Sequence, residues 1–194
     1  LLGNPYHYRD TRTDGMTERV FAIVSPEEIY SATGIQFMQI NTMFQVFAAA
    51  QQNRGVLDLA RHLITIPDLL NYWLTGQITC EFTNATTRQM FDPRKDDWAR
   101  PMLEKLRIPT HFLHEVTQPG TRIGRLRDDL GNAEVIAPAC HDTGSPVAAV
   151  CAGGDRAFVS SGTWSLLGTE VPHPVITPEA RDGNFTNEGG VCGS

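Results

Sequence analysis

Long apolar runs and clusters of basic residues are both missing from this chain. It has no stretch of eighteen consecutive apolar residues and no pattern of a signal peptide near its start, so the sequence predicts no membrane association. The 194 residues include 16 Lys and Arg against 22 Asp and Glu, which gives a net charge of −6. This acidic balance argues against a nucleic-acid binder, although it leaves room for a small anionic ligand held locally.

Cysteine is scarce, with only four in the chain and no CxxC pair. The absence of a disulfide framework favours a reducing compartment, and we expect a cytoplasmic protein. Metal-binding motifs are missing too, because the other histidines have no HxxxH or CxxC spacing with Cys140 or His141. We therefore expect no metal site built by the protein alone. The cysteines are Cys80, Cys140, Cys151 and Cys192.

Two familiar nucleotide-binding motifs, Walker A and GxGxxG, do not occur, and neither do internal repeats or low-complexity segments. What remains is an ordinary folded composition, with 41% hydrophobic and 20% charged residues. The length suits one domain or parts of two, with a substantial core.

Helix signals dominate the first half of the chain. Residues 25–34 combine Ser25 as N-cap, a proline at the first helical position, Glu28 in a capping box and a terminating Gly34. Asn41 is predicted to cap another helix, whose buried face would carry Met43, Val46, Phe47 and Ala50. The further helices are predicted over residues 16–24, 41–53, 67–76 and 96–106.

Strand signals are concentrated after residue 115. A hairpin is predicted over residues 156–171, around Ser-Gly-Thr, because two β-rich arms flank a turn. A short helix over 145–154 is predicted between the strands, with Ser145 as cap and Gly153-Gly154 as its end and as the domain boundary. Residues 80–92 read as a loop with a short strand. The other strands are predicted over residues 4–8, 118–126, 133–139 and 184–190.

His141 and Asp142 stand together after a predicted strand and before a predicted helix. Ligands of α/β proteins bind beyond the carboxyl ends of strands, near helix N-termini. An aspartate at that place can act as a general base for an incoming hydroxyl. It can equally serve only as the N-cap of the helix, and the spacing does not decide between the two.

Three other groups of residues suggest chemistry more weakly. Cys140 beside His141 invites a thiol-nucleophile reading, but adjacent residues of an extended segment point to opposite faces. The stretch of Ser160, Ser161, Gly162 and Thr163 could cradle a phosphate, or be an ordinary turn. A third group consists of Arg9, Asp10 and Arg12. It could orient a polyhydroxylated ligand or lie in a solvated loop.

Seven stretches, in order along nearly the whole chain, resemble landmarks of the FGGY carbohydrate kinases, and among these of the rhamnulokinase group. No single stretch is specific, but the set is, and the HDT and SSGTWSLLG stretches are the most diagnostic. The stretches are YRDTRTDG, TGIQFMQINTMFQ, LLNYWLTG, EFTNATTRQMFD, HDTGSPVAAV, SSGTWSLLG and NFTNEGG.

The resemblance implies an α/β fold of the actin-like, ribonuclease-H-like type, with two domains. It also implies phosphorylation of L-rhamnulose at its first carbon, with ATP and Mg²⁺ as cofactors. Asp142 would be the proton acceptor and would bind the sugar together with His141 and Thr143. Thr163 would contact a phosphate of ATP.

Members of the family are considerably longer than this chain. By the resemblance, residues 1–154 form the larger part of an N-terminal kinase domain, and residues 155–194 form the opening strands of a C-terminal one. Part of the ATP site is then expected outside these residues. We expect the isolated chain to lack kinase activity, and either to self-associate through uncovered apolar faces or to need the remaining residues for order.

Other functions are compatible with the sequence. The sugar could be another ketose, such as xylulose or fuculose, although the SGTWSLLG and TNEGG stretches favour rhamnulose. The chain could also belong to a non-catalytic actin-like protein that binds a sugar or a partner. A thiol hydrolase using Cys140 and His141 is the third alternative.

Overall fold

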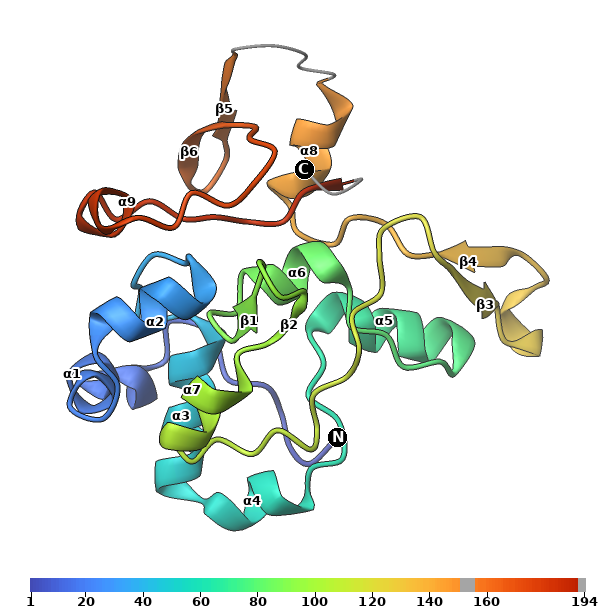
Figure 1. Ribbon diagram of the computed structural model, residues 1–194. Coiled ribbons are helices and arrows are strands. Elements are labelled where there is room, and N and C mark those ends of the chain that lie inside the picture. Colours follow the sequence, from blue (N-terminus) through green and yellow to red (C-terminus); the bar gives the residue numbers. More distant parts are fainter. Residues whose placement is uncertain (151–155, 192–194) are drawn as a thin grey trace. The chain divides into compact units, whose positions relative to one another are not determined.

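The computed structural model describes residues 1–150 and 156–191 (Figure 1). Cys151, Cys192 and the predicted boundary at Gly153-Gly154 lie outside these residues. Contacts divide the chain into two compact units, and each unit is built from separate segments. Unit 1 comprises Leu1–Leu63, Thr86–His114 and Val175–Asn187, whereas unit 2 comprises Ile64–Ala85, Glu115–Pro174 and Glu188–Ser194. The predicted domains 1–154 and 155–194 stay a prediction.

Unit 1 is largely helical. Its one described pair of strands is antiparallel, with Phe91 opposite Trp98 and Asp92 opposite Asp97. Their two rings meet edge to face, 5.5 Å apart between centroids. The elements are η1 (Thr11–Thr13), α1 (Met16–Phe21), α2 (Pro26–Thr33), α3 (Thr42–Gln52), α4 (Arg54–Leu59), β1 (Phe91–Asp92), β2 (Asp97–Trp98), α7 (Arg100–Lys105) and α9 (Pro178–Asp182).

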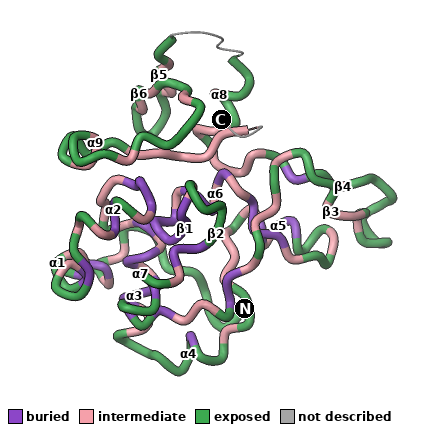
Figure 2. The backbone as a smooth tube through the Cα atoms, viewed as in Figure 1, coloured by how far each residue is buried: buried purple, intermediate pink, exposed green. Residues whose placement is uncertain are grey.

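The buried residues of unit 1 include many in α1, α2, α3, α7 and the strand pair (Figure 2). Burial of each large apolar side chain contributes roughly 1.5–3 kcal/mol of transfer free energy, so this cluster is a main source of the unit's stability. The apolar side chains that are at most 1% exposed include Val20, Ile29, Met43, Phe44, Phe47, Met90, Phe91, Leu103, Leu106 and Phe112.

The predicted start and end of α2 are confirmed. Ser25 Oγ accepts the backbone N–H of Glu28 at 3.2 Å, and Gly34 ends the helix with a φ of +67°. The carboxylate of Glu28 does not complete the expected capping box, because it pairs with Lys105 Nζ at 2.6 Å. Asn41 stands at the N-cap position of the next helix, α3, as predicted, but its side chain makes no cap hydrogen bond. Its amide donates to the carbonyl of Gln36 and to Gln89 Oε1.

Asn187 joins the late segment of unit 1 to the end of α2. Its backbone N–H and its side-chain amide both donate to the carbonyl of Gly34, at 2.9 and 3.0 Å. The same side chain donates to the carbonyl of Val175 at 3.2 Å and accepts its N–H at 2.7 Å. Tyr30 adds a hydrogen bond to the carbonyl of Phe185 at 3.0 Å. Segments more than 140 positions apart are thereby held together.

Unit 2 contains two antiparallel hairpins among its described residues. In the second hairpin, Val159 lies opposite Leu167, and Ser161 lies opposite Ser165. The hairpin expected over 156–171 is therefore confirmed. The elements are α5 (Ile66–Thr75), α6 (Phe82–Thr86, whose last residue is in unit 1), β3 (Arg122–Arg125), η2 (Asp128–Leu130), β4 (Glu134–Ile136), α8 (Gly144–Ala149), β5 (Ala157–Ser161) and β6 (Ser165–Thr169).

Several local expectations were wrong. Residues 4–8 and 184–190 are not strands, because no described strand supplies the hydrogen-bonding partner that an extended segment needs. In residues 80–92, expected as a loop with a short strand, the strand is confirmed as β1, but the helix α6 was not expected. α8 starts at Gly144, so Ser145 lies within it and is not its cap. The sequence analysis also missed α9, which Thr177 caps by accepting the N–H of Ala180 at 3.2 Å.

No helix of the described part of the chain combines the length and the apolarity that crossing a membrane requires.

Gly34 and Gly15 provide a matched test of the packing at the end of α2. Both have a left-handed φ, of +67° and +70°, but a Cβ at Gly34 would lie 3.0 Å from Ile176, whereas a Cβ at Gly15 would meet nothing within 4 Å. We expect Gly15→Ala to lower the free energy of unfolding by about 1 kcal/mol and Gly34→Ala to lower it clearly more. Urea denaturation of each variant measures both values, and equal losses would contradict this account.

Candidate active site

The candidate site lies in unit 2, on the link between β4 and α8. This link is the predicted junction between a strand and a helix. Residues 137–143 run from the end of the strand to the helix that begins at Gly144. Thr143 stands at the N-cap position of α8 but makes no side-chain cap hydrogen bond. Because Thr143 and not Asp142 occupies the N-cap position, the structure argues against the alternative that Asp142 serves only to cap the helix.

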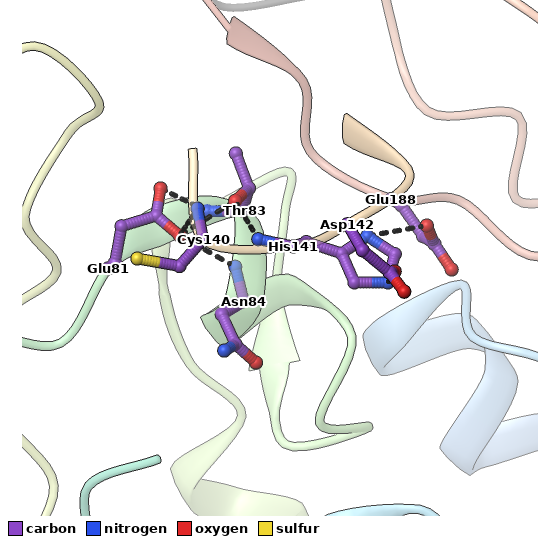
Figure 3. A network of polar contacts seen from close by, with 7 residues as sticks. All are labelled: Glu81, Thr83, Asn84, Cys140, His141, Asp142 and Glu188. Carbon is purple, nitrogen blue, oxygen red and sulfur yellow. Dashed lines mark hydrogen bonds and ion pairs between the residues drawn. The ribbon is translucent and has the colours of Figure 1, made fainter. Parts of the chain in front are cut away.

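The His141 ring lies between two carboxylates (Figure 3). Its Nδ1 is 3.2 Å from Glu188 Oε2, and its Nε2 is 3.5 Å from Asp142 Oδ1. The side chain of Asp142 is 97% exposed, whereas that of His141 is 21% exposed and that of Glu188 is 25% exposed. Asp142 therefore keeps an open carboxylate, which within residues 1–150 and 156–191 has a polar contact only with the imidazole.

The two carboxylates favour the charged form of the imidazole. Burial of the ring lowers the pKa of His141, but its contact with Glu188, together with the negative charges of Glu188, Asp142 and Glu81, outweighs burial. The pKa of His141 therefore lies above its ordinary value of 6.5.

Beneath the His141-Asp142 pair, two buried side chains hold the backbone of the link. Glu81 Oε2 accepts the N–H of Cys140 at 3.1 Å, and Thr83 Oγ1 accepts the N–H of His141 at 3.1 Å. Both side chains are 0% exposed. The sequence analysis missed these residues and Glu188, because their partners in the link lie far away along the chain.

Cys140 is not arranged as a nucleophile. Burial, followed by the charges of Glu81 and Asp68, raises the pKa of its thiol to about 12. Its Sγ lies 3.6 Å from the carbonyl oxygen of Pro138, and the neighbouring His141 ring is engaged with Glu188 and Asp142. A thiol that stays protonated and has no base beside it argues against the thiol hydrolase.

Thr163 lies at the turn of the β5–β6 hairpin, where it is exposed. The N–H of Gly162 donates to the carbonyl of Trp164 at 2.8 Å, so this N–H is occupied within the turn. Ser161 and Ser165 share a hydroxyl–hydroxyl hydrogen bond at 3.0 Å. Among the described residues, no polar contact joins Thr163 to residues 141–143. The hydroxyl of Thr163 thus remains open to a ligand.

In the group of Arg9, Asp10 and Arg12, the side chains of Asp10 and Arg12 make contacts within unit 1. Asp10 accepts the N–H of Arg12 at 2.9 Å, and the Arg12 guanidinium donates to Gln45 and lies 3.9 Å from the centroid of the Tyr6 ring. These contacts attach Arg12 to α3, and both interpretations of the group, ligand binding and a solvated loop, stay predictions.

Protein metal ligands do not gather at the site. In residues 1–150 and 156–191, no group of three His, Cys, Asp or Glu side chains is placed to hold a metal ion.

Residues 1–157 match the model of the N-terminal domain of the FGGY family of carbohydrate kinases, and the chain belongs to that family. It is 44% identical to a rhamnulokinase of Oceanobacillus iheyensis, over 98% of this chain and 42% of the relative. It is 43% identical to a rhamnulokinase of Pectobacterium carotovorum, over the whole of this chain and 39% of the relative. The chain therefore spans about two fifths of the length of these curated relatives.

Solved sugar kinases share the fold. A xylulose kinase from Lactobacillus acidophilus superposes with a TM-score of 0.81 and 21% identity, over 93% of this chain and 38% of that one. A carbohydrate kinase from Novosphingobium aromaticivorans gives a TM-score of 0.76 and 22% identity, over 94% and 41%. The mixed α/β chain is thus a part of the actin-like sugar-kinase fold, as expected from the sequence.

The imidazole of His141 should titrate under the control of Glu188. We expect Glu188→Gln to lower the pKa of His141, and Asp142→Asn to lower it less, because Asp142 is farther from the ring and almost fully solvated. A pH titration of the His141 Cε1–H signal by NMR measures both shifts. A larger effect of Asp142→Asn would show that the contact with Glu188 does not dominate.

The same raised pKa fixes the sign of a stability effect. Because protonated His141 is favoured in the folded state, its stabilising contribution is fully present below pH 6.5 and is lost as the pH rises through the folded-state pKa. Glu188→Gln should reduce that pH dependence, as measured by urea denaturation across the range. An unchanged dependence would contradict the role of the pair.

Proposed function

We propose that the protein containing this chain phosphorylates L-rhamnulose to L-rhamnulose 1-phosphate with ATP, in rhamnose catabolism. One observation carries the proposal most directly. In a member of the FGGY family, the Asp142 carboxylate is open to solvent, and it follows directly on two residues whose backbone N–H groups are fixed by buried acceptors. The similarity to rhamnulokinases supports the choice of sugar.

In the proposed reaction, Asp142 accepts the proton of the sugar's first-carbon hydroxyl as that oxygen attacks the γ-phosphorus. The bond between the γ-phosphorus and the bridging oxygen breaks, and ADP leaves with the electron pair. His141 and Thr143 bind the sugar beside Asp142. Thr163 donates its open hydroxyl to a phosphate oxygen.

The surroundings of Thr163 fit a phosphate group of the nucleotide. The turn at Thr163 offers an exposed hydroxyl next to Gly162, where a Cβ would meet nothing within 4 Å, so a phosphate could approach it. Bound Mg²⁺ would neutralise charge on the phosphates, and it would reach the site with the nucleotide.

We further propose that residues 1–154 belong to the N-terminal kinase domain and 155–194 to the C-terminal one, and that the isolated chain self-associates.

Asp142→Asn in the full-length protein tests the base. The amide keeps the shape of the side chain but does not accept the proton, so we expect kcat to fall by ~10²–10⁴-fold with an unchanged affinity for ATP. Asp129→Asn, at an exposed aspartate of the same unit, is the matched control and should leave kcat unchanged. A coupled assay with L-rhamnulose, xylulose and fuculose measures activity. Preference for another ketose would change the substrate, and an active Asp142→Asn would remove the assigned base.

Thr163→Val tests the nucleotide contact. Loss of a hydrogen bond to a charged phosphate should raise the KM for ATP by roughly 10- to 100-fold, while the KM for the sugar changes little. Thr163→Ser keeps the hydroxyl and should restore most of the affinity. If the sugar KM rises instead, the hairpin does not face the nucleotide.

A further inference from the structure

Glu81 is a buried carboxylate that accepts hydrogen bonds from two separate segments of the chain. Its Oε1 accepts the N–H of Thr83 at 3.0 Å. Its Oε2 accepts the Thr83 hydroxyl at 2.7 Å and the N–H groups of Asn84 and Cys140, both at 3.1 Å (Figure 3). A buried carboxylate needs such donors, because its desolvation is costly without them. Three of the donors open helix α6, and the fourth belongs to the link that leads to Asp142.

Thr83 extends this contact by one residue along the link. While its hydroxyl donates to Glu81, the same oxygen accepts the N–H of His141 at 3.1 Å. The methyl-bearing side of Thr83 also lies close to the start of α8, since a Cβ at Gly144 would be 3.7 Å from Thr83 Cβ. Two consecutive backbone amides are therefore held immediately before Asp142. We call Glu81 and Thr83 together the Glu81–Thr83 clamp.

The Glu81–Thr83 clamp is itself anchored to helix α5. Asp68, also 0% exposed, accepts the N–H of Glu81 at 3.1 Å and the Thr79 hydroxyl at 2.8 Å through Oδ1. Its Oδ2 accepts the Thr65 hydroxyl at 2.8 Å. The side-chain amide of Asn84 donates to that same Thr65 hydroxyl at 3.2 Å. The clamp thus belongs to a continuous buried network, which gives it a fixed position.

We propose that Glu81 and Thr83 are positioning residues that fix the backbone beneath Asp142 for proton transfer. This inference rests on the proposed kinase function. Among the described residues, only the long contact with His141 holds the side chain of Asp142, so its place depends on the backbone that carries it. Small displacements of a reacting group lower rates steeply, and a backbone fixed in advance avoids them. The clamp takes no part in the bonds that form and break.

The experiment compares Thr83→Val with Thr83→Ser in the full-length protein. Valine keeps the shape but removes the oxygen that accepts from His141, whereas serine keeps that oxygen. We expect Thr83→Val to lower kcat by about tenfold at an unchanged KM for ATP, and Thr83→Ser to retain most of the wild-type kcat. Thr121→Val, at an exposed threonine of the same unit, is the matched control and should behave as wild type.

Amide hydrogen exchange gives a readout that does not need catalysis. The N–H groups of Cys140 and His141 should be protected in the wild type, and the N–H of His141 should lose protection in Thr83→Val but not in Thr83→Ser. If the wild type does not phosphorylate a ketose, the proposed function fails, and the exchange data still test the clamp. If Thr83→Val does not fold, Glu81→Gln, which faces an amide NH₂ toward the donors, takes its place.

Two outcomes would overturn the proposal. The first is fast exchange of both amides in the wild type. The second is a folded Thr83→Val whose kcat stays within twofold of wild type while its melting temperature falls, because that pattern belongs to a purely structural contact. Loss of kcat with rescue by serine, together with the matching change in protection at His141, would establish the positioning role.

Discussion

The buried carboxylate of Glu81 imposes the constraint on which the candidate site depends. A fully buried acid must find donors for its lone pairs, and here those donors come from Thr83, Asn84 and Cys140. The first two belong to the next turn of chain, so Glu81 sets the start of α6. The third lies 59 positions away, so the same group also sets the path of the link before α8. One desolvated group therefore couples a local helix start to a distant loop.

Glu81 and Asp142 show how surroundings separate the tasks of two like groups. Glu81 is saturated with donors and has no room for an incoming hydroxyl. Asp142 is 97% exposed and, in the part of the chain that the structure describes, has a polar contact only with the imidazole of His141, so its oxygens remain available to a substrate. A base must gain a proton during each turnover, and an open carboxylate can do so without breaking a buried network. This contrast favours Asp142 over its buried neighbour as the proton acceptor.

The features that could be predicted from the sequence are those that neighbouring residues decide. Ser25, Pro26 and Gly34 specify α2 through contacts within one or two turns, and the Ser-Gly-Thr turn specifies the β5–β6 hairpin. Residues 4–8 and 184–190 were expected as strands from their composition alone. Composition does not supply a partner strand, and the described chain offers none. Side chains with a competing distant partner were also misjudged, as at Asn41, whose amide turns to Gln36 and Gln89 instead of capping α3.

In the candidate site too, features decided by neighbouring residues could be predicted, whereas contacts with distant residues could not. The position of Asp142 on the link between β4 and α8 could be predicted from the strand–loop–helix pattern, but its exposure and the residues that hold the link could not. The TNEGG stretch illustrates the reason, because its adjacent residues Asn187 and Glu188 contact different parts of the chain. The side chain of Asn187 both donates and accepts hydrogen bonds to fasten unit 1, whereas Glu188 contributes charge to His141 in unit 2. A motif identifies the family as a whole, yet each residue's task depends on the distant groups that the fold brings to it, and these appear only in three dimensions.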